Sequence, residues 1–183
     1  MKRFFIFFGI VVIVMIISVY SRVIYTKKAS PQGEVSFSNG DVKISVFYNR
    51  PIKKGRVIFG GLVPFKKVWR TGANEATVFE TNIELDFDGK KLPKGAYSLW
   101  TIPDEQVWKI VFNSEIPMWG VGFDGHVLRK IEDDVLIIDA PVVIQEKEFE
   151  QFTISVEKMG KEMELIFLWD KTLVTVPFTS KQD

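Results

Sequence analysis

Three strongly polar side chains fall within six residues of a sequence that is otherwise rich in apolar, strand-like segments. Residues 70–75 read RTGANE and carry a guanidinium (Arg70), an amide (Asn74) and a carboxylate (Glu75). Gly72 permits backbone conformations that are closed to other residues, and Asn74 tolerates left-handed geometry. This stretch, here called the RTGANE loop, is therefore predicted to be a tight loop in which Arg70 and Glu75 lie close together.

The RTGANE loop has two interpretations. In the first, Arg70 pairs with Glu75 or with a carboxylate on a neighbouring strand, and this pair fixes the loop because a bidentate contact sets orientation as well as charge. In the second, Arg70, Thr71, Asn74 and Glu75 face a cleft, where Arg70 holds an anionic or hydroxyl-rich ligand. The first interpretation is favoured because perturbed polar clusters are only sometimes binding sites.

A second candidate site is the segment 117–126, PMWGVGFDGH, in which Met118, Trp119 and Phe123 lie among glycines. An exposed Trp119 on such a loop would stack on a sugar or dock a partner protein. Alternatively, Trp119 folds over the open end of the body and closes it. The second arrangement is favoured because large rings usually find burial.

Familiar catalytic and metal-binding patterns are missing from the sequence. His126 is the single histidine and there is no cysteine, whereas zinc sites and serine triads draw on several such residues. There is no Gly-x-Ser-x-Gly elbow, and no spacing singles out a pair of carboxylates for glycoside hydrolysis. The sequence therefore predicts no metal and no cofactor, and it favours a non-catalytic role.

The N-terminal segment has the composition of a membrane anchor. Residues 1–33 carry five basic and no acidic side chains, and residues 4–20 form an uncharged run. A helix of this run is roughly 26 Å long, close to the hydrocarbon thickness of a bilayer. A cleaved signal peptide is disfavoured, because the residues after the run are bulky where small residues precede a cleavage site. The sequence predicts an uncleaved transmembrane signal anchor over residues 1–25, with the N-terminus in the cytoplasm and the body outside.

After a short polar linker at residues 26–33, apolar residues recur at every second position, which is typical of half-buried β-strands. The runs with this alternation are 42–48, 83–87, 108–112, 152–156, 163–169 and 174–178. Turn signals such as Asn39-Gly40, Asp88-Gly89 and Met159-Gly160 separate them. Residues 34–179 are therefore predicted to form one all-β domain, an antiparallel β-sandwich or flattened barrel, followed by a tail at residues 180–183.

The charge of the body argues against nucleic acid as a partner. From residue 34 onward the chain carries 19 basic and 23 acidic residues, with the two signs interspersed. Phosphate binding needs a concentrated basic face, which this balance does not supply. The expected partners are the membrane, through the N-terminal helix, and a protein or glycan of the cell envelope.

Four segments of the body resemble a known family. They are GRVIFGGLVPFKKVWRTGANEAT (55–77), LPKGAYSLWTIP (92–103), VFNSEIPMWG (111–120) and LIFLWDKTLVTVPF (165–178). Together they resemble the family called domain of unknown function 2911, and the likeness covers nearly all of residues 42–178. The resemblance implies an exported or envelope-associated bacterial protein, and it implies no particular activity.

Three hypotheses for the function follow. The leading one is a membrane-anchored extracytoplasmic domain that binds an envelope protein or a glycan. The alternative is an extracytoplasmic hydrolase acting on a polar substrate, with Arg70, Asn74 and Glu75 in the site and Glu75 or Asp124 as the reacting carboxylate. The third is a structural module whose surfaces only pack.

Overall fold

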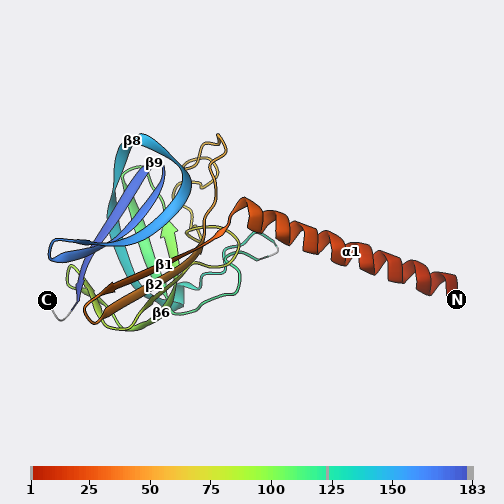
Figure 1. Cartoon of the computed structure of the whole chain (residues 1–183), viewed down its shortest axis with the longest axis horizontal. Coiled ribbons are helices and arrows are strands. Elements are labelled where there is room, and N and C mark those ends of the chain that lie inside the picture. Colours follow the sequence, from red (N-terminus) through yellow and green to blue (C-terminus); the bar gives the residue numbers. More distant parts are fainter. Residues whose placement is uncertain (1, 123, 181–183) are drawn as a thin grey trace.

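The computed structural model of the protein describes residues 2–122 and 124–180. It begins with the helix α1, Lys2–Ala29, which projects from the body as a single rod (Figure 1). The segment Phe5–Ala29 is long and apolar enough to cross a membrane, and its most apolar window is not buried against the body. A helix that is apolar on all sides is unfavourable in water when it is left uncovered, so its composition fits a lipid environment.

The body consists of antiparallel β-strands. They are β1 Gln32–Asn39, β2 Val42–Asn49, β3 Val78–Thr81, β4 Leu85–Phe87, β5 Lys90–Leu92, β6 Gly95–Ile102, β7 Val107–Asn113, β8 Asp134–Met159 and β9 Glu162–Ser180. A short 3-10 turn, Ile131–Asp133, precedes β8. Hydrogen-bonded neighbours follow the order β1-β2-β3-β6-β7-β8-β9-β4-β5.

Two long strands turn this sheet back on itself. The first half of β8 pairs with β7, and its second half pairs mainly with β9. The β8–β9 register shifts on both sides of Phe149, and such bulges bend long strands. The ring of Phe112 on β7 consequently lies 5.5 Å, between centroids, from that of Phe87 on β4. No ladder joins β1 to β5 within residues 2–122 and 124–180, so the predicted all-β sandwich is confirmed and the sheet is not a closed barrel.

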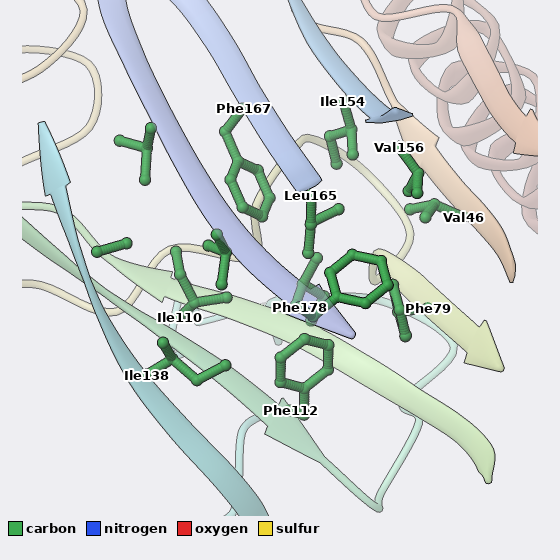
Figure 2. Packing of buried hydrophobic residues seen from close by; sticks show 14 of the residues in the cluster. Val46, Phe79, Ile110, Phe112, Ile138, Ile154, Val156, Leu165, Phe167 and Phe178 are labelled. Carbon is green, nitrogen blue, oxygen red and sulfur yellow. The ribbon is translucent and has the colours of Figure 1, made fainter. Parts of the chain in front are cut away.

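The core lies between the two layers and follows the alternation in the sequence. Successive side chains of a strand point to opposite faces, so one residue in two is buried. Figure 2 shows Phe112, Phe79 and Phe178 meeting Leu165 and Phe167 in this space. The predicted inward residues are buried on each long strand: Val42, Ile44, Val46, Tyr48, Trp108, Ile110, Phe112, Phe152, Ile154, Val156, Met163, Leu165, Phe167, Trp169, Val174, Val176 and Phe178.

Some boundaries differ from those expected from the sequence. α1 continues to Ala29 and β1 begins at Gln32, so the polar stretch 26–33 is divided between a helix and a strand and is not a separate linker. The runs 163–169 and 174–178 belong to one strand, β9. The strand continues past Asp170 even though this residue adopts a left-handed φ of 56°. Of the expected tail, Ser180 ends β9 and residues 181–183 lie outside the described part.

Phe112→Ala is expected to lower the free energy of unfolding by about 3–5 kcal/mol, because the ring is fully buried against three other rings. The measurement is urea unfolding of the full chain in detergent micelles, followed by tryptophan fluorescence. Met159→Ala, at the exposed end of β8, is the control and is expected to change the value by less than about 0.5 kcal/mol. Equal stability of the two variants would contradict this description of the core.

Candidate functional site

The position of the RTGANE loop is set by the residue before it, Trp69. Trp69 and Thr101 on β6 exchange two backbone hydrogen bonds, of 2.7 and 3.0 Å. The ring of Trp69 enters an aromatic cluster, where its centroid lies 4.9 Å from that of Phe152 and 5.9 Å from that of Trp169. Its indole Nε1 also donates to the carbonyl of Gly72 at 3.0 Å. One side chain therefore fills the core and closes the loop.

Thr71 and Gly72 pack the inside of the loop. Thr71 is 0% exposed with a left-handed φ of 51°, and its carbonyl accepts a 2.8 Å hydrogen bond from the hydroxyl of Thr77. The hydroxyl of Thr71 lies 3.3 Å from that of Thr101. A Cβ on Gly72 would come within 2.8 Å of the carbonyl oxygen of Asn49. Both residues hold the loop together, and Thr71 offers no surface to a ligand.

Glu75 binds the end of α1. Its Oε1 lies 2.7 Å from Nζ of Lys27, and its Oε2 accepts a 3.0 Å hydrogen bond from Nδ2 of Asn49 on β2. Burial alone raises the pKa of Glu75, but the hydrogen bonds and the positive charge of Lys27 outweigh it, so the net pKa lies below its ordinary value. The predicted Arg70–Glu75 pair is therefore wrong, because the carboxylate faces the helix.

Asn74 joins the loop to two other parts of the chain. It adopts a left-handed φ of 56°, as its type suggested, and it is buried. Its side-chain amide lies 3.5 Å from the carbonyl oxygen of Thr26 in α1, which is a long hydrogen bond. Its backbone carbonyl accepts from the amide of Gly120 at 3.2 Å. The RTGANE loop thus lies between the end of α1 and the segment that contains Trp119.

Arg70 leaves the loop on the side opposite to the aromatic cluster, because it follows the inward-pointing Trp69 at a strand-like position. Its aliphatic stem packs on Gly120, where an added Cβ would come within 2.5 Å of Cδ of Arg70. Its Nε is buried and has no hydrogen-bond partner in the described part of the chain. Burial accordingly lowers the pKa of Arg70.

A second buried arginine, which the sequence analysis missed, shows the contrasting arrangement. The side chains of Arg129 and Asp134 are 7% and 8% exposed and form a salt bridge through both guanidinium Nε and Nη2. Asn113 donates a further hydrogen bond to the same carboxylate at 2.9 Å. This pair fastens the segment 114–133 to β7 and β8. The spacing of five residues between the two charges was the available signal in the sequence.

The segment 117–126 presents its apolar side chains unequally. Met118 is 88% exposed, whereas Trp119 is more covered and is partly buried. Phe123 lies outside the described residues. The exposed His126 donates its backbone N–H to the carboxylate of Asp124 at 3.1 Å. Trp119 therefore lies next to Gly120, the residue on which the stem of Arg70 packs.

The RTGANE loop does not line the cavity of about 160 Å³ that lies elsewhere in the body. That cavity is lined by Phe59, Phe65, Asp104, Glu105, Trp108 and residues of β8 and β9. Within residues 2–122 and 124–180, no group of three or more His, Cys, Asp or Glu side chains is arranged to hold a metal ion.

A family model described as "Protein of unknown function (DUF2911)" matches residues 30–178. The chain belongs to this family. No curated protein and no solved structure matches the chain. The match covers the β body, including the RTGANE loop, and α1 lies outside the matched residues.

The chemistry that the DUF2911 domain can perform at the RTGANE loop follows from which groups are already occupied. Glu75 is held by Lys27 and Asn49, and Thr71 is sealed in the interior. Arg70 is different, since it carries a positive charge that the described residues leave without a hydrogen bond or an ion pair. A partly desolvated, unpaired guanidinium is suited to binding a carboxylate or a phosphate.

Arg70→Met is expected to leave the free energy of unfolding unchanged or to raise it by up to about 2 kcal/mol, because it removes a desolvated polar group that has no partner. Arg129→Met is the matched comparison. It is expected to lower the free energy of unfolding by about 3–5 kcal/mol, because it leaves the buried carboxylate of Asp134 without its ion-pair partner. Urea unfolding of the full chain in micelles measures both. A loss at Arg70 as large as that at Arg129 would show that Arg70 is a structural residue.

Glu75→Gln is expected to lower the melting temperature at neutral pH and to lose this effect in acid. A carboxyl whose pKa is lowered by folding stabilises the protein above its ordinary pKa of 4.5, and the contribution vanishes as the pH falls through the lower value in the folded state. The difference in melting temperature between the two proteins, followed in micelles from pH 7 into acid, should therefore narrow below about pH 4.5. Glu80→Gln, on the exposed face of β3, is the control. A difference for Glu75→Gln that stays constant would contradict the ion pair with Lys27.

Proposed function

We propose that the protein is a membrane-anchored binding domain, in which α1 holds the β body at a bilayer and Arg70 binds an anionic group of an envelope protein or glycan. The single observation that carries the proposal is the unpaired Nε of Arg70, buried on Gly120. The other polar groups of the RTGANE loop have partners within the chain.

The energetics of Arg70 support a ligand. A buried donor without a partner destabilises a protein by about 1–3 kcal/mol, and a charged group by more. A carboxylate or phosphate that pairs with this guanidinium compensates its positive charge, and the planar fork of arginine fixes the orientation of the ligand. An arginine kept for structure alone would be expected to have a carboxylate partner, as Arg129 does.

The placement of the site supports an envelope ligand. The loop that carries Arg70 touches the end of α1 through Glu75 and Asn74, so the site lies beside the membrane in which α1 is proposed to insert. The N-terminus is proposed to be cytoplasmic and the body extracytoplasmic, because α1 resembles an export signal that is not cleaved. This protein is proposed to belong to a bacterial cell envelope on the same grounds.

The hydrolase alternative has no comparable support. It needs a carboxylate free to act next to Arg70, and Glu75 is occupied by Lys27 and Asn49. Asp124 lies on the segment after Gly120, and its carboxylate accepts from the backbone of His126.

The test is parallel purification of the full chain and its Arg70→Met variant from their own membrane, followed by mass spectrometry of the bound proteins and small molecules. Lys161→Met, which removes an exposed charge in the turn between β8 and β9, is the control. We expect an anionic component that is recovered with the wild type and with Lys161→Met but depleted at least tenfold with Arg70→Met, since one charge-assisted contact is worth about 1.5–3 kcal/mol. Recovery of the same components with all three proteins would refute the proposed role of Arg70.

A further inference from the structure

The body is tied closely to the end of α1. Only Ser30 and Pro31 separate the helix from β1, and both are fixed: the amide of Ser30 donates to Thr26, and the carbonyl of Pro31 accepts from the amide of Arg50. The Lys27–Glu75 ion pair adds a contact through side chains. The connection between α1 and β1, residues 30–31 and here called the junction, is therefore held in place by these contacts.

The junction lies close to the level at which α1 would leave the hydrocarbon. The uncharged run of the helix ends before Arg22, and α1 continues over the eight residues 22–29. At about 1.5 Å per residue this is roughly 12 Å, a little more than the depth of one headgroup layer, which is about 5–8 Å. The nearest parts of the body must therefore lie at the headgroups or just above them.

Two loops occupy this end of the body. The β1–β2 register places Gln32 opposite Asn49 at the junction and turns at the far end, so the loop 51–68 that follows β2 starts beside the helix. The hydrogen bond from Gly120 to Asn74 brings the segment 114–130 to the same end. Figure 1 shows both loops on the side where α1 leaves, with the β8–β9 turn at the opposite end of the body.

These two loops expose apolar side chains singly, on either side of the junction. Met118 is 88% exposed, Val57 is 72% exposed and Leu62 is 45% exposed. Val57 and Leu62 belong to the loop 51–68, and Met118 belongs to the segment 114–130. Apolar side chains at the level of the lipid headgroups can insert between the polar groups of that layer.

The charges of the loop 51–68 and its flanking residues have the sign that an anionic lipid surface attracts. Residues 50–70 contain seven lysines and arginines and no acidic residue. Lys53 and Lys66 are paired with acids of the body. The side chains of Lys54, Arg56 and Lys67 form no ion pair in the described part of the chain, although the guanidinium of Arg56 donates to the carbonyls of Ile52 and Lys53. Long basic side chains of this kind reach lipid phosphates while their stems stay on the protein surface.

We propose that these two loops, 51–68 and 114–130, form a second membrane contact, with Met118 and Val57 inserted among lipid headgroups and the unpaired basic residues of 51–68 bound to lipid phosphates. The proposal rests on the anchoring by α1 put forward above. It assigns the loops a lipid surface as their partner and makes the body a domain that lies on the bilayer.

The absence of cysteine from the chain makes a direct test possible, since a single introduced cysteine carries a single label. Met118→Cys and Val57→Cys report on the two loops, Met159→Cys on the far end of the body, and Val14→Cys on the middle of α1. Each full-length variant is labelled with an environment-sensitive fluorophore and reconstituted into vesicles of phosphatidylcholine and phosphatidylglycerol. Quenching by lipids that carry a nitroxide on the headgroup or deep in the acyl chain gives the depth of each label.

We expect the label at position 14 to be quenched by the deep nitroxide, and the labels at 118 and 57 to be quenched by the headgroup nitroxide at least threefold more than the label at 159. If position 14 is deep while 118 and 57 behave like 159, the membrane contact of the loops is refuted and the anchor stands. If position 14 is not quenched, the anchoring by α1 fails, and the proposal that depends on it fails too. Quenching at 118 and 57 that does not fall in vesicles of phosphatidylcholine alone would refute the role given to the basic residues.

Discussion

The rest of the site depends on the burial of one ring, that of Trp69. Its indole packs against Phe152 and Trp169 at the side of the core, and its Nε1 donates to the carbonyl of Gly72. Because neighbouring residues in an extended chain point in opposite directions, a Trp69 fixed inward leaves Arg70 no direction but away from the core. The direction of the guanidinium is thus a result of how the aromatic cluster packs, and no polar contact of its own sets it.

The two buried arginines of the body show how differently the same side chain can be used. Arg129 meets Asp134 in a fork that also engages Asn113, so its charge is compensated and the segment before β8 is held in place. The stem of Arg70 packs on Gly120, and its buried Nε–H has no hydrogen-bond acceptor in the described part of the chain. In a marginally stable domain a loss of about 1 kcal/mol matters, so a buried donor without a partner is unfavourable. Such departures from the usual rules of folding are expected mainly at functional sites.

Much of the architecture could be predicted from the sequence, because the alternation of apolar residues reports directly on which face of a strand is buried. For this reason the predicted inward-facing residues of β2, β7, β8 and β9 are the ones that are buried, and the predicted all-β sandwich is confirmed. Local pattern carries no such information about long-range contacts. The pairing of Glu75 with Lys27 spans 48 residues and depends on α1 continuing to Ala29, and the apparent proximity of Glu75 to Arg70 in the sequence pointed to the wrong partner. The left-handed Asn74, in contrast, was a local property and was foreseen.

The two-residue connection between α1 and β1 has a mechanical consequence. A domain swivels on its anchor only when several unrestrained residues lie between them, and here Ser30 and Pro31 are both hydrogen-bonded. Tilting or rotating the helix must therefore carry the whole body with it as a lever. In the proposed membrane-anchored arrangement, a thicker bilayer or a neighbouring helix that changes the inclination of α1 would also change the direction of the surface that bears Arg70, without altering a contact inside the body.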